Sequence, residues 1–163
     1  MTDETAISCA DSPTPVYCQS EKVDLDTQAV FNNRCVRIQP DVPELDSYKI
    51  LHTKIQQLTK DKGWNTVMIT SPRAGEGKTT TAINLALTFS KAYDQTVLLV
   101  DCDLRRQNIH KMLGFNNHRG LIDCLMDGKL LRDIIIWPSI EKLILISGGA
   151  PHIAAPNCRA RSV

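Results

Sequence analysis

The chain has 163 residues, of which 42% are hydrophobic and 23% charged, and its formal net charge is +1. This composition is typical of one soluble globular domain, and the near-zero charge gives no support for a nucleic-acid partner. No apolar run is long enough to span a bilayer, and the acidic start is unlike a signal peptide. None of the six cysteines forms a C-x-x-C pair, which disfavours a zinc site or a redox motif. A cytoplasmic protein is therefore expected.

The first part of the chain is expected to hold little regular structure before one long helix. Residues 1–40 contain stretches rich in Ser, Thr, Pro and Asp, so we predict a weakly ordered segment there. Pro43 opens a helix with apolar residues at helical spacing, and Gly63 ends it. Helix 43–60 either packs on the domain or forms a homo-oligomer interface, and the sequence favours packing.

A phosphate-binding loop is predicted between a strand over 66–70 and a helix over 78–91. Gly75 and Gly77 let the backbone curl around a polyphosphate, because glycine tolerates positive φ and has no Cβ. The start of the following helix adds N–H groups and positive charge. Lys78 would reach the β- and γ-phosphates, and the Thr79 hydroxyl would bind Mg²⁺. The expected nucleotide-binding residues are Arg73, Ala74, Gly75, Glu76, Gly77, Lys78, Thr79 and Thr80.

A second motif follows a predicted strand over 96–101. Its four consecutive apolar residues, 97–100, are typical of a strand buried on both faces, as in a parallel sheet. Asp101 and Asp103 then emerge at the carboxyl end of the strand, where open α/β sheets place their ligands. Two carboxylates beside a phosphate loop suit Mg²⁺, and one of them could orient or deprotonate an attacking hydroxyl. The alternative role is capping of the next helix, which the neighbouring phosphate loop makes the lesser possibility.

The remaining chain continues the alternation of strands and helices. The predicted elements are a helix over about 106–113, short helices over 121–126 and within 130–137, and a strand over 142–147. Such alternation implies crossover connections and a parallel sheet. We therefore predict an α/β, three-layer P-loop NTPase fold with a mainly parallel sheet. The partial domain is expected at 41–149, followed by an irregular tail at 150–163.

Both motifs resemble those of the bacterial tyrosine kinases of capsule and exopolysaccharide synthesis, within the MinD/ParA-like P-loop ATPases. The resemblance rests on T-S-P-R-A-G-E-G-K-T-T at 70–80 and L-L-V-D-C-D-L-R-R at 98–106, and it extends over most of residues 41–150. It implies ATP and Mg²⁺ as cofactors. The implied catalytic residues are Lys78, Asp101 and Asp103, and the implied metal ligands are Thr79, Asp101 and Asp103.

The chain departs from the family pattern at several places. Pro72 replaces the first glycine of the general phosphate-loop pattern, and Arg73 replaces the signature lysine of the MinD/ParA ATPases. His52 replaces an arginine of the family's assembly helix, which puts self-assembly in doubt. After Gly149 the family continues with a helix and an apolar strand that ends in the Walker B aspartate. The tail 150–163 contains no such strand, so we expect a member truncated before Walker B.

The resemblance implies a cytoplasmic protein-tyrosine autokinase of exopolysaccharide or capsule synthesis that transfers a phosphoryl group from Mg-ATP to tyrosine. The missing Walker B strand keeps a second function open, a catalytically impaired nucleotide-binding regulatory module. A MinD/ParA-type partitioning ATPase is a third, which Arg73 disfavours. The implied partners are the nucleotide and a membrane adaptor protein for polysaccharide chain length, through which the protein would associate with the membrane.

Overall fold

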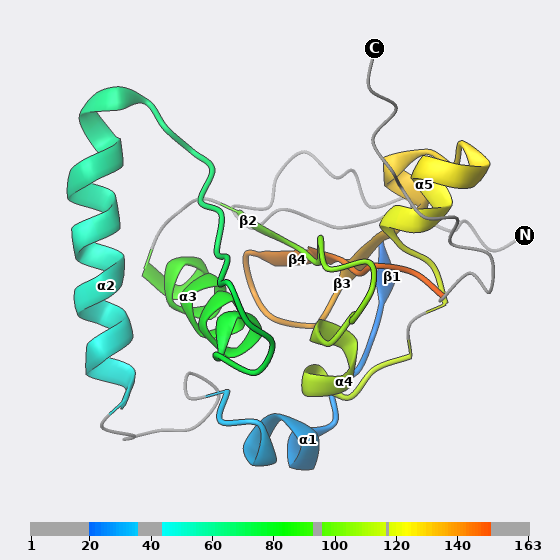
Figure 1. The fold of residues 1–163 in the computed structure, drawn as a ribbon, viewed down its shortest axis with the longest axis horizontal. Coiled ribbons are helices and arrows are strands. Elements are labelled where there is room, and N and C mark those ends of the chain that lie inside the picture. The colour runs from blue at the N-terminus through cyan, green and yellow to red at the C-terminus, as the bar shows by residue number, and fades with distance from the viewer. Residues whose placement is uncertain (1–19, 36–43, 93–95, 117, 151–163) are drawn as a thin grey trace, which may run out of the picture.

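The computed structural model describes residues 20–35, 44–92, 96–116 and 118–150 (Figure 1). Its sheet has the strand order β1-β3-β4-β2. The strands are β1 (Glu21–Lys22), β2 (Val97–Val100), β3 (Ile135–Trp137) and β4 (Leu143–Ile146). β1 runs parallel to β3 and β2 runs parallel to β4, whereas β3 and β4 are antiparallel. The predicted α/β class with a mainly parallel sheet is confirmed.

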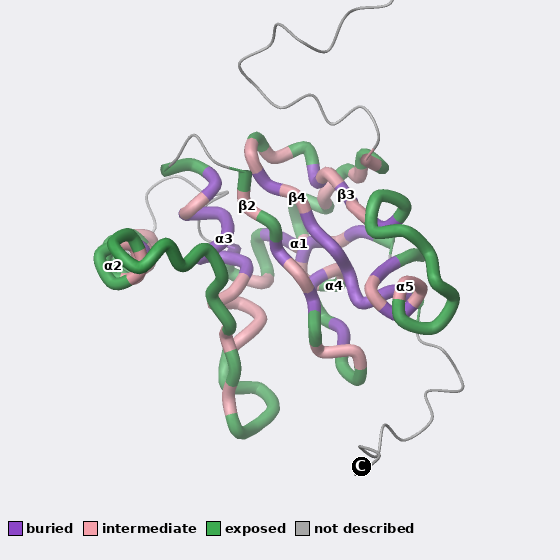
Figure 2. The backbone as a smooth tube through the Cα atoms, turned by 90° about the horizontal axis from the view of Figure 1, so that it is seen from above, coloured by how far each residue is buried: buried purple, intermediate pink, exposed green. Residues whose placement is uncertain are grey.

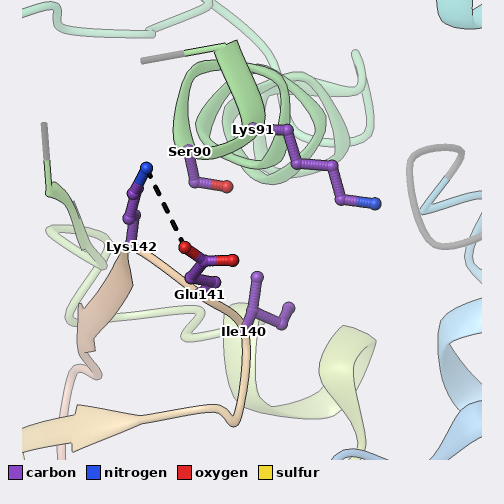
Figure 3. A pocket seen from close by; sticks show the side chains of 5 residues that line it. All are labelled: Ser90, Lys91, Ile140, Glu141 and Lys142. Atoms are coloured by element: carbon purple, nitrogen blue, oxygen red, sulfur yellow. Dashed lines mark ion pairs between the residues drawn. The ribbon is translucent and has the colours of Figure 1, made fainter. Parts of the chain in front are cut away.

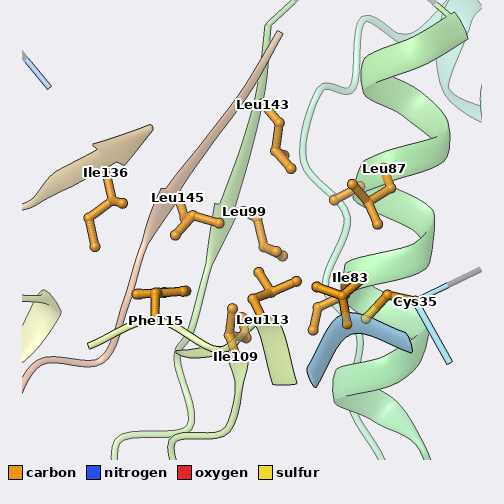
Figure 4. Packing of buried hydrophobic residues seen from close by; sticks show 12 residues of the cluster. Cys35, Ile83, Leu87, Leu99, Ile109, Leu113, Phe115, Ile136, Leu143 and Leu145 are labelled. Carbon is orange, nitrogen blue, oxygen red and sulfur yellow. The ribbon is translucent and has the colours of Figure 1, made fainter. Parts of the chain in front are cut away.

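One face of the sheet carries the hydrophobic core. Leu99, Leu145 and Ile136 lie side by side across β2, β4 and β3, and each is at most 8% exposed. The helices α3 (Lys78–Ala92) and α4 (Ile109–Leu113) cover this face with Ile83, Leu87, Ile109 and Leu113 (Figure 4). Burying each large aliphatic side chain stabilises the fold by about 1.5–3 kcal/mol. Leu98 points to the opposite face and is 49% exposed, so the prediction that this strand is buried on both faces is wrong there.

The long helix α2 (Glu44–Thr59) packs against α3 and lies outside it, away from the sheet (Figures 1 and 2). His52 is buried in this contact, edge-on to the ring of Phe89 with the centroids 4.4 Å apart. A 3-10 turn η1 (Lys60–Lys62) follows, and Gly63 ends it with φ of 64°. The predicted helix and its packing role are confirmed. No described helix is both long and apolar enough to cross a membrane.

Residues 20–35 belong to the folded domain, which contradicts the expectation of weak order over 1–40 for this part. β1 adds to the sheet, and α1 (Thr27–Asn32) begins at Asp26, whose side chain caps its first turn. Val30 and Cys35 are 2% and 0% exposed and lie in the same core as the sheet. Burial raises the pKa of the Cys35 thiol to about 11. Residues 1–19 and the tail from 151 lie outside the described residues.

The strand predicted over residues 66–70 is not observed. This segment is extended but belongs to none of the four strands of the sheet, and Val67 and Met68 are 48% and 82% exposed. In both views it runs on the β2 side of the molecule (Figures 1 and 2). An apolar sequence becomes a strand only where a neighbouring backbone satisfies its hydrogen bonds. The apolar pattern of residues 66–70 can be read from the sequence, but the presence of an adjacent strand to pair with cannot.

Two other elements differ from their predictions. Within 130–137, a 3-10 turn η2 (Leu131–Asp133) leads into β3, so the prediction of a helix is wrong for the second half. Antiparallel pairing with β4 suits the β-branched Ile135 and Ile136 better than a helix does. The helix expected from about 106 begins at Ile109, because hydrogen bonds to Asp101 and Asp103 shape the preceding residues into turns.

The helix α5 (Leu121–Asp127) begins at the carboxyl end of β4, and Asp123 fixes its start. The Asp123 Oδ2 accepts the N–H of Gly120 at 2.7 Å, and the Asp123 Oδ1 pairs with Lys129 Nζ at 2.7 Å. Gly120 approaches the β4 end so closely that a Cβ would lie 2.2 Å from the Ser147 oxygen. Burial alone would raise the pKa of Asp123, but the hydrogen bonds from Lys129 and Gly120 outweigh it and hold the pKa below its ordinary value.

We predict that Asp123→Asn lowers the free energy of unfolding at neutral pH by about 1 kcal/mol, the usual value of a helix cap. A carboxyl whose folded pKa is depressed stabilises the fold above its unfolded pKa. The difference from wild type should therefore shrink as the pH falls through and below about 4. Denaturant unfolding at pH 7 and pH 3 measures both effects. Asp127→Asn, at the other end of α5, is the matched control, and an equal loss in the two variants would contradict the cap.

Candidate phosphate-binding site

The predicted phosphate loop connects the extended segment 66–70 to α3. Gly75 and Gly77 both have φ of 82°, in the left-handed region that favours glycine. A Cβ at either glycine would meet no atom within 4 Å, so the backbone angle, not space, requires glycine. Both positions were predicted for this reason, and the positive φ values confirm it.

The loop is open to solvent and its first hydrogen bonds are local. Residues 72–77 are exposed, and Lys78, Thr79 and Thr80 are half-buried in the first turn of α3. The Arg73 N–H donates to Glu76 Oε2 at 3.2 Å, so an anionic oxygen already binds one backbone donor of the loop. Helix geometry leaves the first N–H groups of α3 without intrahelical partners. This is the donor arrangement that a phosphate requires.

Asp101 lies at the carboxyl end of β2, 6% exposed, and its carboxylate binds backbone N–H groups of the loop that follows. Oδ1 accepts the N–H of Asp103 at 3.1 Å. Oδ2 accepts the N–H groups of Asn108 and Ile109 at 3.2 and 3.3 Å, which caps α4. Helix capping, the lesser alternative in the sequence, is therefore observed. The predicted role of Asp101 as a metal ligand stays a prediction.

Asp103 faces the phosphate loop. Its Oδ2 lies 3.9 Å from Lys78 Nζ, and the two side chains are 36% and 29% exposed. Its Oδ1 accepts the N–H of Arg106 at 3.0 Å, which fixes the turn after β2. The structure thus brings together Lys78 and Asp103 from two elements that are separate in sequence. Carboxylate and hydroxyl oxygens, as in Asp103 and Thr79, are the hard ligands that Mg²⁺ prefers, so these residues fit this ion.

His110 lies on α4, near Asp101. Burial lowers the pKa of its imidazole, the Lys111 charge lowers it further, and Asp101 acts in the opposite direction. The ring lies edge-on to Phe115 with the centroids 6.3 Å apart. His110 is therefore a packing residue of α4 that is mostly neutral at pH 7.

Residues of the N-terminal segment hold the two helices of the site, and the sequence did not predict this. Asn84, 0% exposed on α3, donates to the Arg34 oxygen at 3.0 Å. Asn33 donates to the Met112 oxygen of α4 at 3.2 Å, and the Asp26 N–H donates to the Leu113 oxygen at 3.2 Å. The sequence signal for this contact is Asn84, a polar residue among the apolar residues of the helix 78–91, where a buried amide would need a hydrogen-bond partner.

A shallow hollow in the described surface lies away from the phosphate loop. It has a volume of about 410 Å³ and is lined by Ser90, Lys91, Ile140, Glu141 and Lys142 (Figure 3). The Lys142–Glu141 ion pair, 3.8 Å long, lies in it. Ser90 and Lys91 are at the far end of α3, about 20 Å from Lys78 for a helix of this length.

The comparison with known families agrees with this geometry. Residues 67–146 match the CobQ/CobB/MinD/ParA nucleotide binding domain, and the match contains the loop, Lys78, Asp101 and Asp103. This segment is similar to MinD/ParA-like nucleotide-binding domains.

Similar proteins include bacterial tyrosine kinases. The chain is 33% identical over 132 residues to the tyrosine-protein kinase YwqD of Bacillus subtilis, covering 76% of this chain and 55% of YwqD. It is 31% identical over 136 residues to EpsB of Ralstonia nicotianae, covering 80% of this chain and 18% of EpsB. The chain thus spans from under a fifth to about half of these relatives.

Two solved structures have a similar fold. The chimerical protein CapA2B2 has 25% sequence identity and a TM-score of 0.58, over 86% of this chain and 57% of that one. The BceF tyrosine kinase domain has 24% identity and a TM-score of 0.61, over 86% of this chain and 59% of that one. The predicted resemblance to bacterial tyrosine kinases is confirmed at the level of fold and sequence.

We predict that Gly77→Ala weakens Mg-ATP binding by at least tenfold, because alanine at a left-handed φ costs about 1–2 kcal/mol and reshapes the loop. Gly63→Ala is the matched control, since Gly63 has φ of 64°, an equally open Cβ position and lies at the end of η1. Both variants should lose similar unfolding free energy, and only Gly77→Ala should lose affinity in calorimetric titration. An unchanged affinity of Gly77→Ala would contradict the assignment of the loop.

Proposed function

We propose that this chain binds Mg-ATP at the phosphate loop and acts in phosphoryl transfer to tyrosine, as a member of the bacterial tyrosine kinases. The observation that carries the proposal is the 3.9 Å approach of Lys78 Nζ to Asp103 Oδ2. A cation on the phosphate loop and a carboxylate at the end of the neighbouring strand are the two charges that phosphoryl transfer uses. The names of the similar proteins support tyrosine as the acceptor.

Each residue has a role in this proposal. The N–H groups of the loop and of the first turn of α3 hold the phosphates, and Lys78 compensates their negative charge. The Thr79 hydroxyl and the Asp103 carboxylate would hold Mg²⁺, which would supply positive charge to offset that of the phosphates. In this proposal Asp103 also accepts the proton of the attacking tyrosine hydroxyl. Arg73 in the loop and Arg106 in the turn after β2 are exposed, and their positive charge favours an anionic nucleotide.

Partners and setting are the finer part of the proposal. A role in exopolysaccharide synthesis, a cytoplasmic location and a membrane adaptor protein come from the family resemblance. Self-association through α2 has support from its outer face, where Ile50 and Leu58 are 58% and 66% exposed. These expectations concern the whole protein, and the chain spans about half of YwqD.

We predict that Lys78→Ala abolishes the stabilisation by Mg-ATP. At a ligand concentration of a hundred times Kd, wild type should gain roughly 2.7 kcal/mol of unfolding free energy. Lys54→Ala, an exposed lysine on α2, should keep the full gain. Thermal unfolding with and without Mg-ATP measures this. Equal stabilisation of wild type and Lys78→Ala would place the nucleotide elsewhere.

We predict that Asp103→Asn weakens Mg-ATP binding by only about tenfold but reduces phosphoryl transfer to tyrosine at saturating Mg-ATP by at least about a hundredfold, in line with the loss of a positioned proton acceptor. Transfer of labelled phosphate from ATP to this chain or to a tyrosine-rich peptide measures it. The second function, a nucleotide-binding module without turnover, predicts binding and no transfer even in wild type. Wild-type transfer would exclude that module.

A further inference from the structure

We propose that Asp101 is a positioning residue: its carboxylate folds the loop of residues 101–109 so that Asp103 stands opposite Lys78. The proposal rests on the proposed function, because it gives Asp101 a role in that same phosphate site. In this proposal Asp103 and Thr79 are the residues that would bind Mg²⁺. Asp101 would affect Mg²⁺ binding only by fixing the position of Asp103.

The hydrogen bonds of Asp101 carry the proposal. Three backbone N–H groups, those of Asp103, Asn108 and Ile109, donate to its two oxygens at 3.1 to 3.3 Å. The side chain is buried, at 6% exposure. A carboxylate that accepts three N–H groups inside the protein has given up most of its acceptor positions to the backbone. Few acceptor positions of the Asp101 carboxylate therefore remain for Mg²⁺.

Asp103 has the opposite environment. It is half-buried, its Oδ1 accepts only the local N–H of Arg106, and its Oδ2 points to Lys78. The Asp103 N–H is itself one of the three donors to Asp101. The backbone of Asp103 is therefore fixed by Asp101, while its side chain remains available to the ligand.

The loop that Asp101 closes is anchored at both ends. The Asp101 N–H donates to the Ile146 oxygen at 2.9 Å, which continues the β2–β4 pairing beyond the strand. At the other end, Ile109 and Leu113 of α4 are buried in the core at 4% and 1% exposure. Asp101 bridges these two rigid parts, so the bend between them, which holds Asp103, has one shape.

Asparagine cannot replace this carboxylate. The Asn side chain has one acceptor oxygen and an NH₂ group, so in Asp101→Asn the NH₂ faces N–H donors on one side. Hydrogen bonds to a charged group are worth more than those to a neutral one, so the variant loosens the loop. Asp103→Asn leaves all three bonds to Asp101 in place, which makes it the matched control.

Amide hydrogen exchange of the ligand-free protein tests the folding of the loop. In wild type, the N–H groups of Asp103, Asn108 and Ile109 should be protected, although Asn108 and Ile109 precede the intrahelical bonds of α4. In Asp101→Asn these three should exchange at least tenfold faster, while Leu145 in β4 reports global stability. Unprotected amides in wild type would overturn the proposal without any variant. So would unchanged exchange in Asp101→Asn.

A double-mutant cycle on the Kd of Mg-ATP tests the path through Asp103. We expect Asp101→Asn and Asp103→Asn each to weaken binding roughly tenfold, and the double variant to match Asp103→Asn within twofold. Losses that multiply would show that Asp101 contacts the ligand independently, which contradicts the proposal. If wild type binds no Mg-ATP, the proposed function fails, and with it the effect of Asp101 on the ligand. The exchange experiment then decides separately whether Asp101 folds the loop.

Discussion

The packing of α3 on the paired strands β2 and β4 is the contact on which the rest of the structure depends. Leu99 and Leu145 face α3 across the sheet, and Ile83 and Leu87 of α3 fill the space above them. This contact fixes the start of α3 relative to the carboxyl end of β2. The phosphate loop leads into the start of α3, and Asp103 follows the end of β2, so the approach of Lys78 to Asp103 is a consequence of this packing.

The N-terminal segment 20–35 extends this core and stiffens the site. Its backbone oxygen at Arg34 accepts a hydrogen bond from Asn84 on α3, and the Asn33 side chain binds the Met112 oxygen on α4. The family match begins at residue 67 and does not include this segment. Segment 20–35 thus contacts both helices that carry the site.

The sequence predicted the loop correctly because its chemistry is local. Gly75 and Gly77 need positive φ for reasons contained in a few residues, and the start of α3 follows from the same stretch. The prediction of a strand over 66–70 was wrong because strand pairing depends on a segment distant in sequence. Leu98 is exposed for a similar reason, since burial also depends on which distant elements cover that face of the sheet. The different environments of Asp101 and Asp103 could not be predicted either. Two carboxylates in one motif differ only in the groups that the fold places against them.

The location of the nucleotide is the central claim, and amide chemical-shift mapping tests it most directly. Addition of Mg-ATP to isotopically labelled protein should shift the amides of residues 73–80 and of Asp103. The amides of Ser90 and Lys142, which line the hollow at the far end of α3, should stay unchanged. Shifts confined to that hollow, or none at saturating Mg-ATP, would contradict the assignment of this loop as the nucleotide site.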